Sequence, residues 1–178
     1  AGITANINLT SWSERHIYVY GSPLHLRRAM MNIYSNCIKY NRKNGEITTD
    51  IEVIDFNEKT VTYRWTISDT GIGMSQEFLT RIFEPFVQAD TDARSVYQGT
   101  GLGMSIAKAL IEQMGGTLEI SSELNVGSRF VVTIPFELAD ESEVVKIEKD
   151  ADVSIKGMHI LLAEDNELNR EIAETLLR

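Results

Sequence analysis

The chain has 178 residues, of which 43% are hydrophobic and 24% charged, and its formal net charge is −9. This length and composition are ordinary for one well-cored globular domain with residues left over, and the negative charge argues against nucleic acid or anionic lipid as the main partner. No apolar run approaches the ~20 residues of a membrane span, and a single cysteine, Cys37, excludes an internal disulfide. We therefore expect a soluble fragment.

Two short strands, over residues 7–9 and 17–20, are predicted to precede a long helix. Ser22 as N-cap and Pro23 as the first helical residue indicate where the helix begins, and it should end near residue 40. Its apolar stripe has spacings of four, three and four residues: Leu26, Met30, Ile33 and Cys37. We expect this stripe to face the core, with Cys37 as a buried, inert thiol.

The same helix carries a polar strip beside the apolar stripe. Asn32 and Asn36 are one turn apart, and Lys39 and Tyr40 follow one turn later. For an arbitrary helix, a solvated polar face is the plainer interpretation. Asparagine is a poor helix former, however, so two of them at this spacing favour a role in binding.

Residues 47–56 and 60–69 are predicted to form antiparallel strands. Alternation in the second strand places Asp69 on its apolar side, where an ionised group is costly unless hydrogen bonds are donated to it. Gly71 and Gly73 follow, and glycines permit positive φ or close approach to a bound molecule. Asp69 therefore either binds a ligand or ends the strand in a turn, bonded only to nearby backbone amides.

A short helix over residues 76–82 leads into R-I-F-E-P-F, residues 81–86, in which Phe83 and Phe86 are expected to be packing anchors. Residues 88–98 show no periodicity, which is typical of a functional or mobile loop. Gly99, Gly101 and Gly103 then precede an amphipathic helix. Glycines before a helix N-terminus let backbone N–H groups point at an anion, most naturally phosphate. The spacing fits neither a Walker A loop nor a Rossmann or protein-kinase glycine loop.

Strands over residues 118–122 and 129–136 are predicted to complete this first domain. A charged segment then reads as a linker, and Gly157 introduces a buried-type strand, the acidic pair Glu164 and Asp165, and a helix. A lone strand and helix cannot form a core, so we expect the chain to stop early in a second domain.

Four motifs resemble those of a known family. N-I-Y-S-N-C-I-K-Y-N, D-T-G-I-G-M, R-I-F-E-P-F and G-T-G-L-G-M resemble, in order, the N, G1, F and G2 boxes of the catalytic ATP-binding domain of sensor histidine kinases, within the GHKL ATPase superfamily. The tail is similar to the start of a response-regulator receiver domain. The resemblance implies a bacterial hybrid histidine kinase, with the catalytic domain at residues 1–137, a linker at 138–156 and a truncated receiver domain at 157–178.

The implied fold is an α/β two-layer sandwich, with a mixed, mainly antiparallel sheet and three helices on one face. The implied cofactors are ATP and Mg²⁺, with Asp69 accepting a hydrogen bond from the adenine amino group and Tyr40 against the purine. Asn36 would bind Mg²⁺ and Lys39 would lie near the phosphates, so these two would be the catalytic residues. The resemblance implies these nucleotide contacts: Asn32, Asn36, Lys39, Tyr40, Asp69, Gly71, Gly73, Met74, Phe83, Arg94, Gly99, Thr100, Gly101, Leu102, Gly103 and Met104. Glu164 and Asp165 would bind Mg²⁺ only in a complete receiver domain.

The sequence also departs from its relatives. Hydrolases of the superfamily carry a glutamate general base where this chain has Asn32, and an amide cannot accept a proton at neutral pH, so transfer is favoured over hydrolysis. Ser22 stands where many relatives have Asp, and Gln98 where a glycine is common. The phosphoacceptor motif H-E-x-x-T-P is absent.

The expected partners are therefore ATP, a histidine-bearing dimerisation domain of the same homodimeric protein, and the receiver domain, with no nucleic acid and no direct membrane contact. The fragment would be the cytoplasmic part of a membrane-anchored sensor. The alternatives are an ATP-binding sensing or scaffold module without phosphotransfer, and, less favoured, a hydrolase.

Overall fold

The structure is a computed structural model that describes residues 2–10, 17–88 and 100–140. The chain divides into two compact units, residues 1–144 and 145–178, and the second lies outside the described residues. The predicted receiver segment, including Glu164 and Asp165, therefore stays a prediction. The helices and strands of the first unit are β1 (Thr4–Thr10), β2 (Tyr18–Tyr20), α1 (Pro23–Lys39), β3 (Glu46–Phe56), β4 (Thr60–Asp69), α2 (Gln76–Arg81), α3 (Gly103–Gln113), β5 (Thr117–Glu123) and β6 (Gly127–Ala139).

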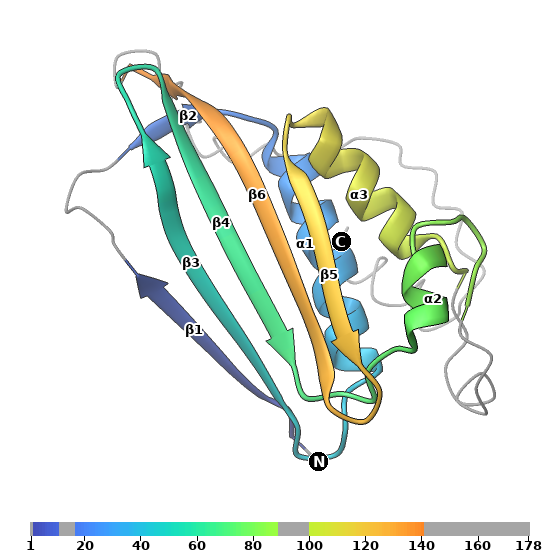
Figure 1. The fold of residues 1–178 in the computed structure, drawn as a ribbon. Coiled ribbons are helices and arrows are strands. Elements are labelled where there is room, and N and C mark those ends of the chain that lie inside the picture. The colour runs from blue at the N-terminus through green and yellow to red at the C-terminus, as the bar shows by residue number, and fades with distance from the viewer. Residues whose placement is uncertain (1, 11–16, 89–99, 141–178) are drawn as a thin grey trace, which may run out of the picture. The chain divides into compact units, whose positions relative to one another are not determined.

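The strands form one mixed sheet in the order β1-β3-β4-β6-β2, and β5 also pairs with β6 (Figure 1). Among the strands that the structure describes, β1 and β3 pair in parallel, while the other pairs are antiparallel. Strand β6 is central because it pairs with β4, β5 and, at its C-terminal end, β2. The mixed, mainly antiparallel sheet expected from the sequence is thus confirmed.

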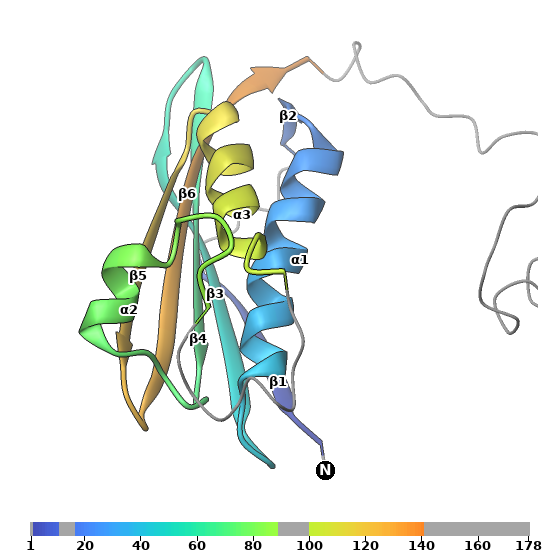
Figure 2. The same cartoon turned by 90° about the vertical axis from the view of Figure 1, so that its right-hand side faces the viewer.

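The helices make the second layer. Helices α1 and α3 lie side by side against one face of the sheet, and α2 lies beside β5 at its edge (Figures 1 and 2). The core forms where the two long helices meet the strands, and its fully buried side chains include Ile33, Ile67, Ile111 and Ile134. This is the two-layer α/β sandwich that the sequence predicted.

Helix α1 begins as predicted, with the Ser22 hydroxyl oxygen accepting a hydrogen bond from the His25 N–H at 3.2 Å. Its buried stripe differs by one position from the prediction, because Ala29 is fully buried with Ile33 and Cys37. Leu26 and Met30 pack only partly against the core. A small residue at position 29 permits close packing of α1 against its neighbours, which a count of large apolar residues does not reveal.

Two further predictions need correction. Phe86 is not a packing anchor: its side chain is 74% exposed and its φ is 66°, so the chain turns there and points the ring outward. Only Phe83 of that pair packs against the core. Strand β6 also continues to Ala139, because residues 137–139 pair with β2, so residues 138 and 139 belong to the sheet and not to the predicted linker.

Candidate functional site

Asp69 ends β4, and its carboxylate is held by backbone donors. Its Oδ1 accepts from the Gly71 N–H at 2.8 Å and from the Ser128 N–H, on the neighbouring β6, at 3.3 Å. Desolvation by burial raises the pKa of Asp69, and the hydrogen bonds from Gly71, Cys37 and Ser128 oppose that rise. Both backbone bonds go to Oδ1, so Oδ2 takes no part in them. The carboxylate is therefore oriented but sits where an ionised group is costly.

Cys37 lies beside this carboxylate, in the last turn of α1. It is 1% exposed, and burial, followed by the charge of Asp69, raises the pKa of its thiol. The expectation of a buried thiol is confirmed, and its burial together with the raised pKa fits an unreactive group. Its contact with Asp69 was not foreseen, because a helix and a strand end cannot be paired from their separate periodicities.

The turn after Asp69 is fastened to the end of α1. The Ile72 N–H donates to the Tyr40 carbonyl at 3.0 Å, and a Cβ built at Gly71 would lie 2.5 Å from that same carbonyl oxygen. The same Cβ would lie 2.7 Å from Asp69 Oδ1. Position 71 is therefore a glycine because the helix end, the turn and the carboxylate meet there.

The other side of the turn is fastened to the β5–β6 hairpin. The Met74 N–H donates to the Ser122 hydroxyl at 2.8 Å, and that hydroxyl donates to the Gly127 carbonyl at 2.8 Å. Gly73 has φ 67°, and a Cβ there would lie 1.9 Å from the Glu123 carbonyl oxygen. Ser122 could not be predicted from the sequence, because nothing in its local pattern distinguishes it from other strand serines.

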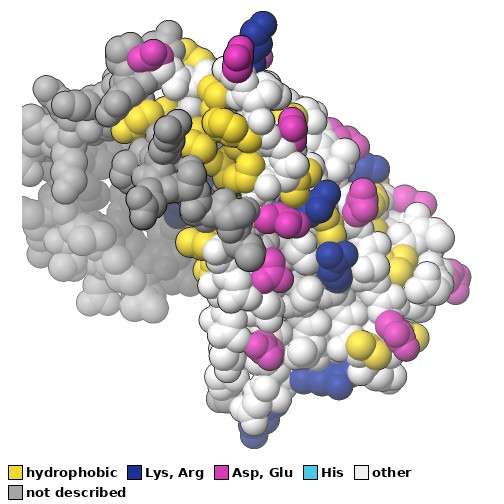
Figure 3. All heavy atoms as spheres, turned by 60° about the vertical axis from the view of Figure 1, so that its left-hand side comes forward, with side chains coloured by type: hydrophobic (Ala, Val, Ile, Leu, Met, Phe, Trp, Pro, Cys, Tyr) yellow, Lys and Arg dark blue, Asp and Glu magenta, His cyan; other side chains and the backbone are white. Residues whose placement is uncertain are grey.

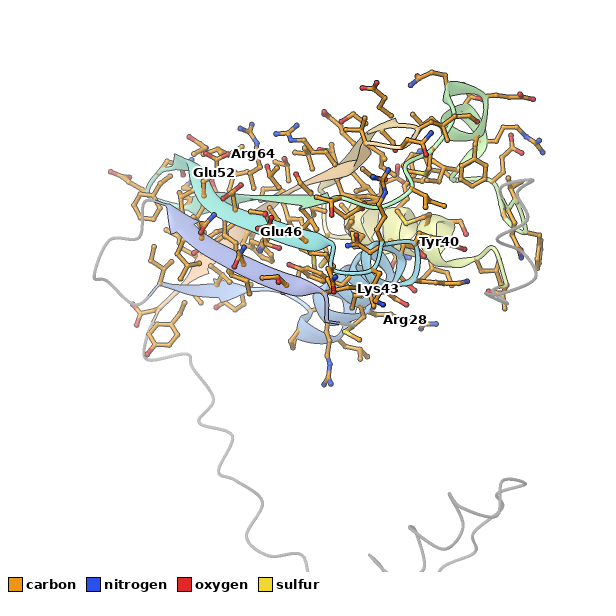
Figure 4. All side chains as sticks on the ribbon, turned by 90° about the horizontal axis from the view of Figure 1, so that it is seen from below. Arg28, Tyr40, Lys43, Glu46, Glu52 and Arg64 are labelled. Atoms are coloured by element: carbon orange, nitrogen blue, oxygen red, sulfur yellow. The ribbon has the colours of Figure 1, made fainter. Side chains whose placement is uncertain are left out.

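The predicted polar strip on α1 runs alongside this turn. Asn32, Asn36 and Lys39 are half-buried, and Tyr40 is 37% exposed. Lys39 Nζ lies 4.9 Å from the centre of the Tyr40 ring, a distance typical of a cation–π contact. Figure 4 shows Tyr40 at the end of α1, well apart from Glu52 and Arg64 on the sheet. The strip is thus neither fully solvated nor part of the core.

The described part of the glycine loop, residues 100–103, lies near α1 at Asn32, whereas the Asp69 turn contacts α1 at Tyr40. A Cβ built at Gly103 would lie 3.5 Å from Asn32 Oδ1, so the start of α3 faces the polar strip. Gly101 has φ 69°, and its carbonyl accepts from the Phe86 N–H at 3.1 Å. The loop therefore connects the end of R-I-F-E-P-F to the asparagine-bearing face.

Helix α3 begins without a side-chain cap. Leu102 at the N-cap position makes no capping hydrogen bond, and the first turn holds no acidic residue. Helix N-termini carry unsatisfied N–H groups and a partial positive charge, which suit an anion. This end of α3 therefore has the features that an anion would need, and phosphate binding there stays a prediction.

The remaining predicted contacts divide into three groups. Met104 is 6% exposed, and Met74 and Phe83 pack against the core, so these three side chains support the site from beneath. Lys108 Nζ, which the sequence analysis missed, lies 4.6 Å from the centre of the Phe83 ring. Thr100 is exposed and Leu102 half-buried at the loop itself. Arg94 and Gly99 lie outside the described residues.

The side-chain oxygens on α1 suit a metal ion whose other ligands are water and the phosphates of a substrate. Within residues 2–10, 17–88 and 100–140, no three His, Cys, Asp or Glu side chains are grouped so as to hold a metal ion. Asn32 and Asn36 offer carboxamide oxygens, which are ligands that Mg²⁺ accepts, and Mg²⁺ usually keeps waters and substrate phosphates as its other ligands. In the same ranges no helix is long and apolar enough to cross a membrane.

Curated relatives of this chain are parts of much longer proteins. It is 43% identical over 131 residues to hybrid signal transduction histidine kinase A of Dictyostelium discoideum, covering 70% of this chain and 6% of that protein. It is 30% identical to the autoinducer 2 sensor kinase/phosphatase LuxQ of Vibrio cholerae, covering 99% of this chain and 20% of that protein. The sensor protein GacS of Pseudomonas syringae is 34% identical, with 86% of this chain and 16% of that protein covered.

Solved structures show the same fold. Full-length ShkA in complex with AMPPNP matches with a TM-score of 0.63 at 29% identity, over 78% of this chain and 26% of that one. The catalytic domain of histidine kinase ThkA matches with a TM-score of 0.58 at 27% identity, over 75% of this chain and 78% of that one. A family model described as histidine kinase-, DNA gyrase B-, and HSP90-like ATPase matches residues 21–138. The chain therefore belongs to the family of histidine kinase-, DNA gyrase B- and HSP90-like ATPases, and its homologues include sensor histidine kinases.

Proposed function

We propose that this chain is the ATP-binding catalytic domain of a hybrid sensor histidine kinase, and that it transfers the γ-phosphate of Mg·ATP to a histidine on a separate dimerisation domain. One observation carries the proposal. Helix α1 is flanked on one side by the Asp69 turn, through Tyr40 and Ile72, and on the other by the glycine loop, through Asn32 and Gly103. A base-binding end and a phosphate-binding end thus share one polar helix face.

The base end is where adenine would bind. Asp69 Oδ1 is held by two backbone amides, and Oδ2, which takes no part in those two bonds, would accept a hydrogen bond from an exocyclic amino group. Guanine has a carbonyl oxygen where adenine has its amino group. That oxygen and an ionised carboxylate are both hydrogen-bond acceptors, so they could not form a hydrogen bond with each other. The half-buried carboxylate therefore supports selection of adenine over guanine. The AMPPNP complex of the related ShkA supports the same choice of ligand.

The phosphate end would combine backbone donors with a cation. The uncapped N-terminus of α3 presents N–H groups, and Lys39 adds positive charge near the end of α1. Asn36, with its carboxamide on the same face, would be a ligand of Mg²⁺. A bound Mg²⁺ would neutralise charge on the phosphates during transfer. The residues of this chain would position the nucleotide and keep its terminal phosphate accessible to the acceptor histidine.

Asn32 supports transfer in preference to hydrolysis. It lies beside Gly103, at the phosphate end, and its carboxamide cannot take a proton from water at neutral pH. A neutral imidazole is already a nucleophile, so phosphoryl transfer to histidine needs no general base on this domain. Relatives of this chain are four or more times longer than it is. The rest of such a full-length protein would supply the acceptor histidine and the receiver domain. The full-length protein would work as a homodimer in a membrane-anchored sensor.

The direct test is phosphotransfer to a supplied acceptor. The 178-residue chain is mixed with labelled ATP, Mg²⁺ and the isolated dimerisation domain of the Dictyostelium discoideum relative, which is 43% identical in the matched region. We expect label on that domain's histidine and none on a variant in which the histidine is replaced by glutamine. Tight ATP binding without any transfer would favour the scaffold alternative, and release of inorganic phosphate without labelled histidine would favour a hydrolase.

A further inference from the structure

Strand β1 ends the sheet and leaves one edge open. Within the described part of the chain, β3 is the strand that pairs with it. The Thr4 N–H donates toward β3, to the Gly45 carbonyl at 3.0 Å. Because backbone groups alternate sides along a strand, Ala5, Ile7 and Leu9 direct their N–H and C=O groups to the open edge. An open edge of this kind is a template for another strand.

This edge lacks the devices that usually block such pairing. Its seven residues, T-A-N-I-N-L-T, contain no charge and no proline, and their register with β3 has no bulge. On the helix side of the sheet, Ile7 is 66% exposed and Leu9 60% exposed. Figure 3 brings the side of the molecule that carries β1 forward; hydrophobic side chains gather toward the top of this view and are scattered singly over the rest. The edge is therefore flat, neutral and partly apolar.

The strand is also nearly the same when read in either direction. T-A-N-I-N-L-T reversed is T-L-N-I-N-A-T, so only Ala5 and Leu9 exchange places. We propose that β1 pairs with β1 of a second copy of this chain, antiparallel, about a two-fold axis at Ile7. Asn6 of one copy then lies opposite Asn8 of the other, and Ala5 opposite Leu9. Every apolar residue meets an apolar residue, and every asparagine meets an asparagine.

The backbone geometry agrees with this register. Ile7 would face itself, and the pairs of Ala5 with Leu9 would lie two residues to either side. These are the positions whose N–H and C=O groups already point to the open edge, as the hydrogen-bonded pairs of an antiparallel ladder require. The axis is perpendicular to the sheet, so Ile7 and Leu9 of both copies share the helix side. Their exposed surfaces would then cover one another.

The charges of the molecule permit the approach. Each copy carries a formal charge of −9, but β1 has no charged side chain. The nearest acids are on β3, where Asn8 Nδ2 donates to Asp50 at 2.8 Å and Asn6 Nδ2 donates to Glu46. The two β3 strands would be three strand spacings apart, about 14 Å, beyond the screening length of roughly 8 Å at physiological salt. Repulsion between these acids is therefore largely screened at physiological salt.

In the proposed dimer, Ile7 of one chain lies directly opposite Ile7 of the other, and the test uses this. The wild-type chain should sediment as a dimer at high concentration, and Ile7→Lys and Ile7→Glu should each weaken dimerisation at least about tenfold, because like charges then meet directly. A mixture of the two variants should dimerise again, since Lys then faces Glu. Leu24 of α1, which is 70% exposed and away from this edge, supplies the matched control. Leu24→Lys should dimerise like wild type.

Three results would overturn the proposal. They are a wild-type chain that stays monomeric up to millimolar concentration, Ile7 variants that dimerise as strongly as wild type, and a mixture of Ile7→Lys with Ile7→Glu that remains monomeric. A monomer in which Ile7→Lys lowers the melting temperature would instead indicate that another part of the same chain covers β1. Circular dichroism spectra of the variants should match wild type, because Ile7 is mostly exposed and its backbone groups do not bond to β3.

Discussion

The two ends of the candidate site are built differently. The Asp69 turn is tied to α1 by the bond from Ile72 to Tyr40 and to the β5–β6 hairpin by the bond from Met74 to Ser122. Among residues 100–103, the described part of the glycine loop, one comparable tie runs from the Phe86 N–H to the Gly101 carbonyl, and the helix that follows has no side-chain cap. The base end is thus fixed by the fold, whereas the phosphate end presents donors that a ligand would satisfy. Specificity should therefore depend on the turn, and transfer on the helix face and the loop.

The largest effect is expected where the two ends meet, at Asn36. We expect Asn36→Ala to reduce Mg·ATP-dependent phosphotransfer by about 10² or more, because the transition-state charge would lose a positioned cation. Adenine binding without Mg²⁺ should change little. Ser35→Ala, on the exposed neighbouring position of the same helix, is the control. Full activity of Asn36→Ala in the acceptor-labelling assay would remove Asn36 from the metal site.

Gly71→Ala tests whether the base end is as tightly built as its contacts indicate. The new Cβ would lie 2.5 Å from the Tyr40 carbonyl oxygen and 2.7 Å from Asp69 Oδ1, so the turn must move. We expect the free energy of unfolding to fall by about 1–3 kcal/mol and nucleotide affinity to fall with it. Gly2→Ala, where a Cβ meets nothing within 4 Å, should leave both unchanged in urea unfolding and calorimetry. An unaffected Gly71→Ala would mean that the turn is not rigid.

Asp69→Asn changes the chemistry of the base end with little change in shape. We expect adenine-nucleotide affinity to fall by about 1–3 kcal/mol, because an amide that replaces an acceptor leaves a buried partner mismatched. Asp55→Asn, at an exposed position on the β3–β4 hairpin, should bind like wild type. Equal affinities of the two variants would place adenine elsewhere.

A smaller effect should appear in the pH dependence of stability. Burial raises the pKa of Asp69 above its usual value of 3.8, so the folded chain holds this proton more tightly than the unfolded chain. The ionised carboxylate therefore costs stability at neutral pH, and this cost disappears as the pH falls through the folded pKa. Relative to Asp69→Asn, which cannot titrate here, the wild type without nucleotide should gain stability on acidification. A constant difference across a urea-unfolding pH series would contradict the raised pKa.

The sequence predicted most of the elements because their signals are local. Ser22 and Pro23 mark the start of α1, period-two alternation marks β4 and β6, and Asp69 was placed on the core side by counting alone. The sequence predicts positive φ or close approach at Gly71 and Gly73, and a Cβ built at either position would meet backbone atoms. These features depend on neighbours along the chain, which a sequence displays directly.

The predictions that failed or were missing depend on neighbours in space. Ala29 is fully buried although its side chain is small, because α1 packs closely at that point, and Phe86 turns outward because its backbone adopts positive φ. The last residues of β6 have the composition of a linker, and their partner strand, β2, lies far from them along the chain. Ser122, Ser128 and Cys37 reach the Asp69 turn from three different elements. No local pattern identifies such contacts.

The most direct test of the adenine-nucleotide site is a calorimetric titration of this chain with a non-hydrolysable ATP analogue, with and without Mg²⁺, and with the matching GTP analogue. We predict binding of the ATP analogue that Mg²⁺ strengthens, and much weaker binding of the GTP analogue. Equal binding of both nucleotides would contradict the assignment of Asp69 to the base. No binding by a chain that circular dichroism shows to be folded would contradict the site as a whole.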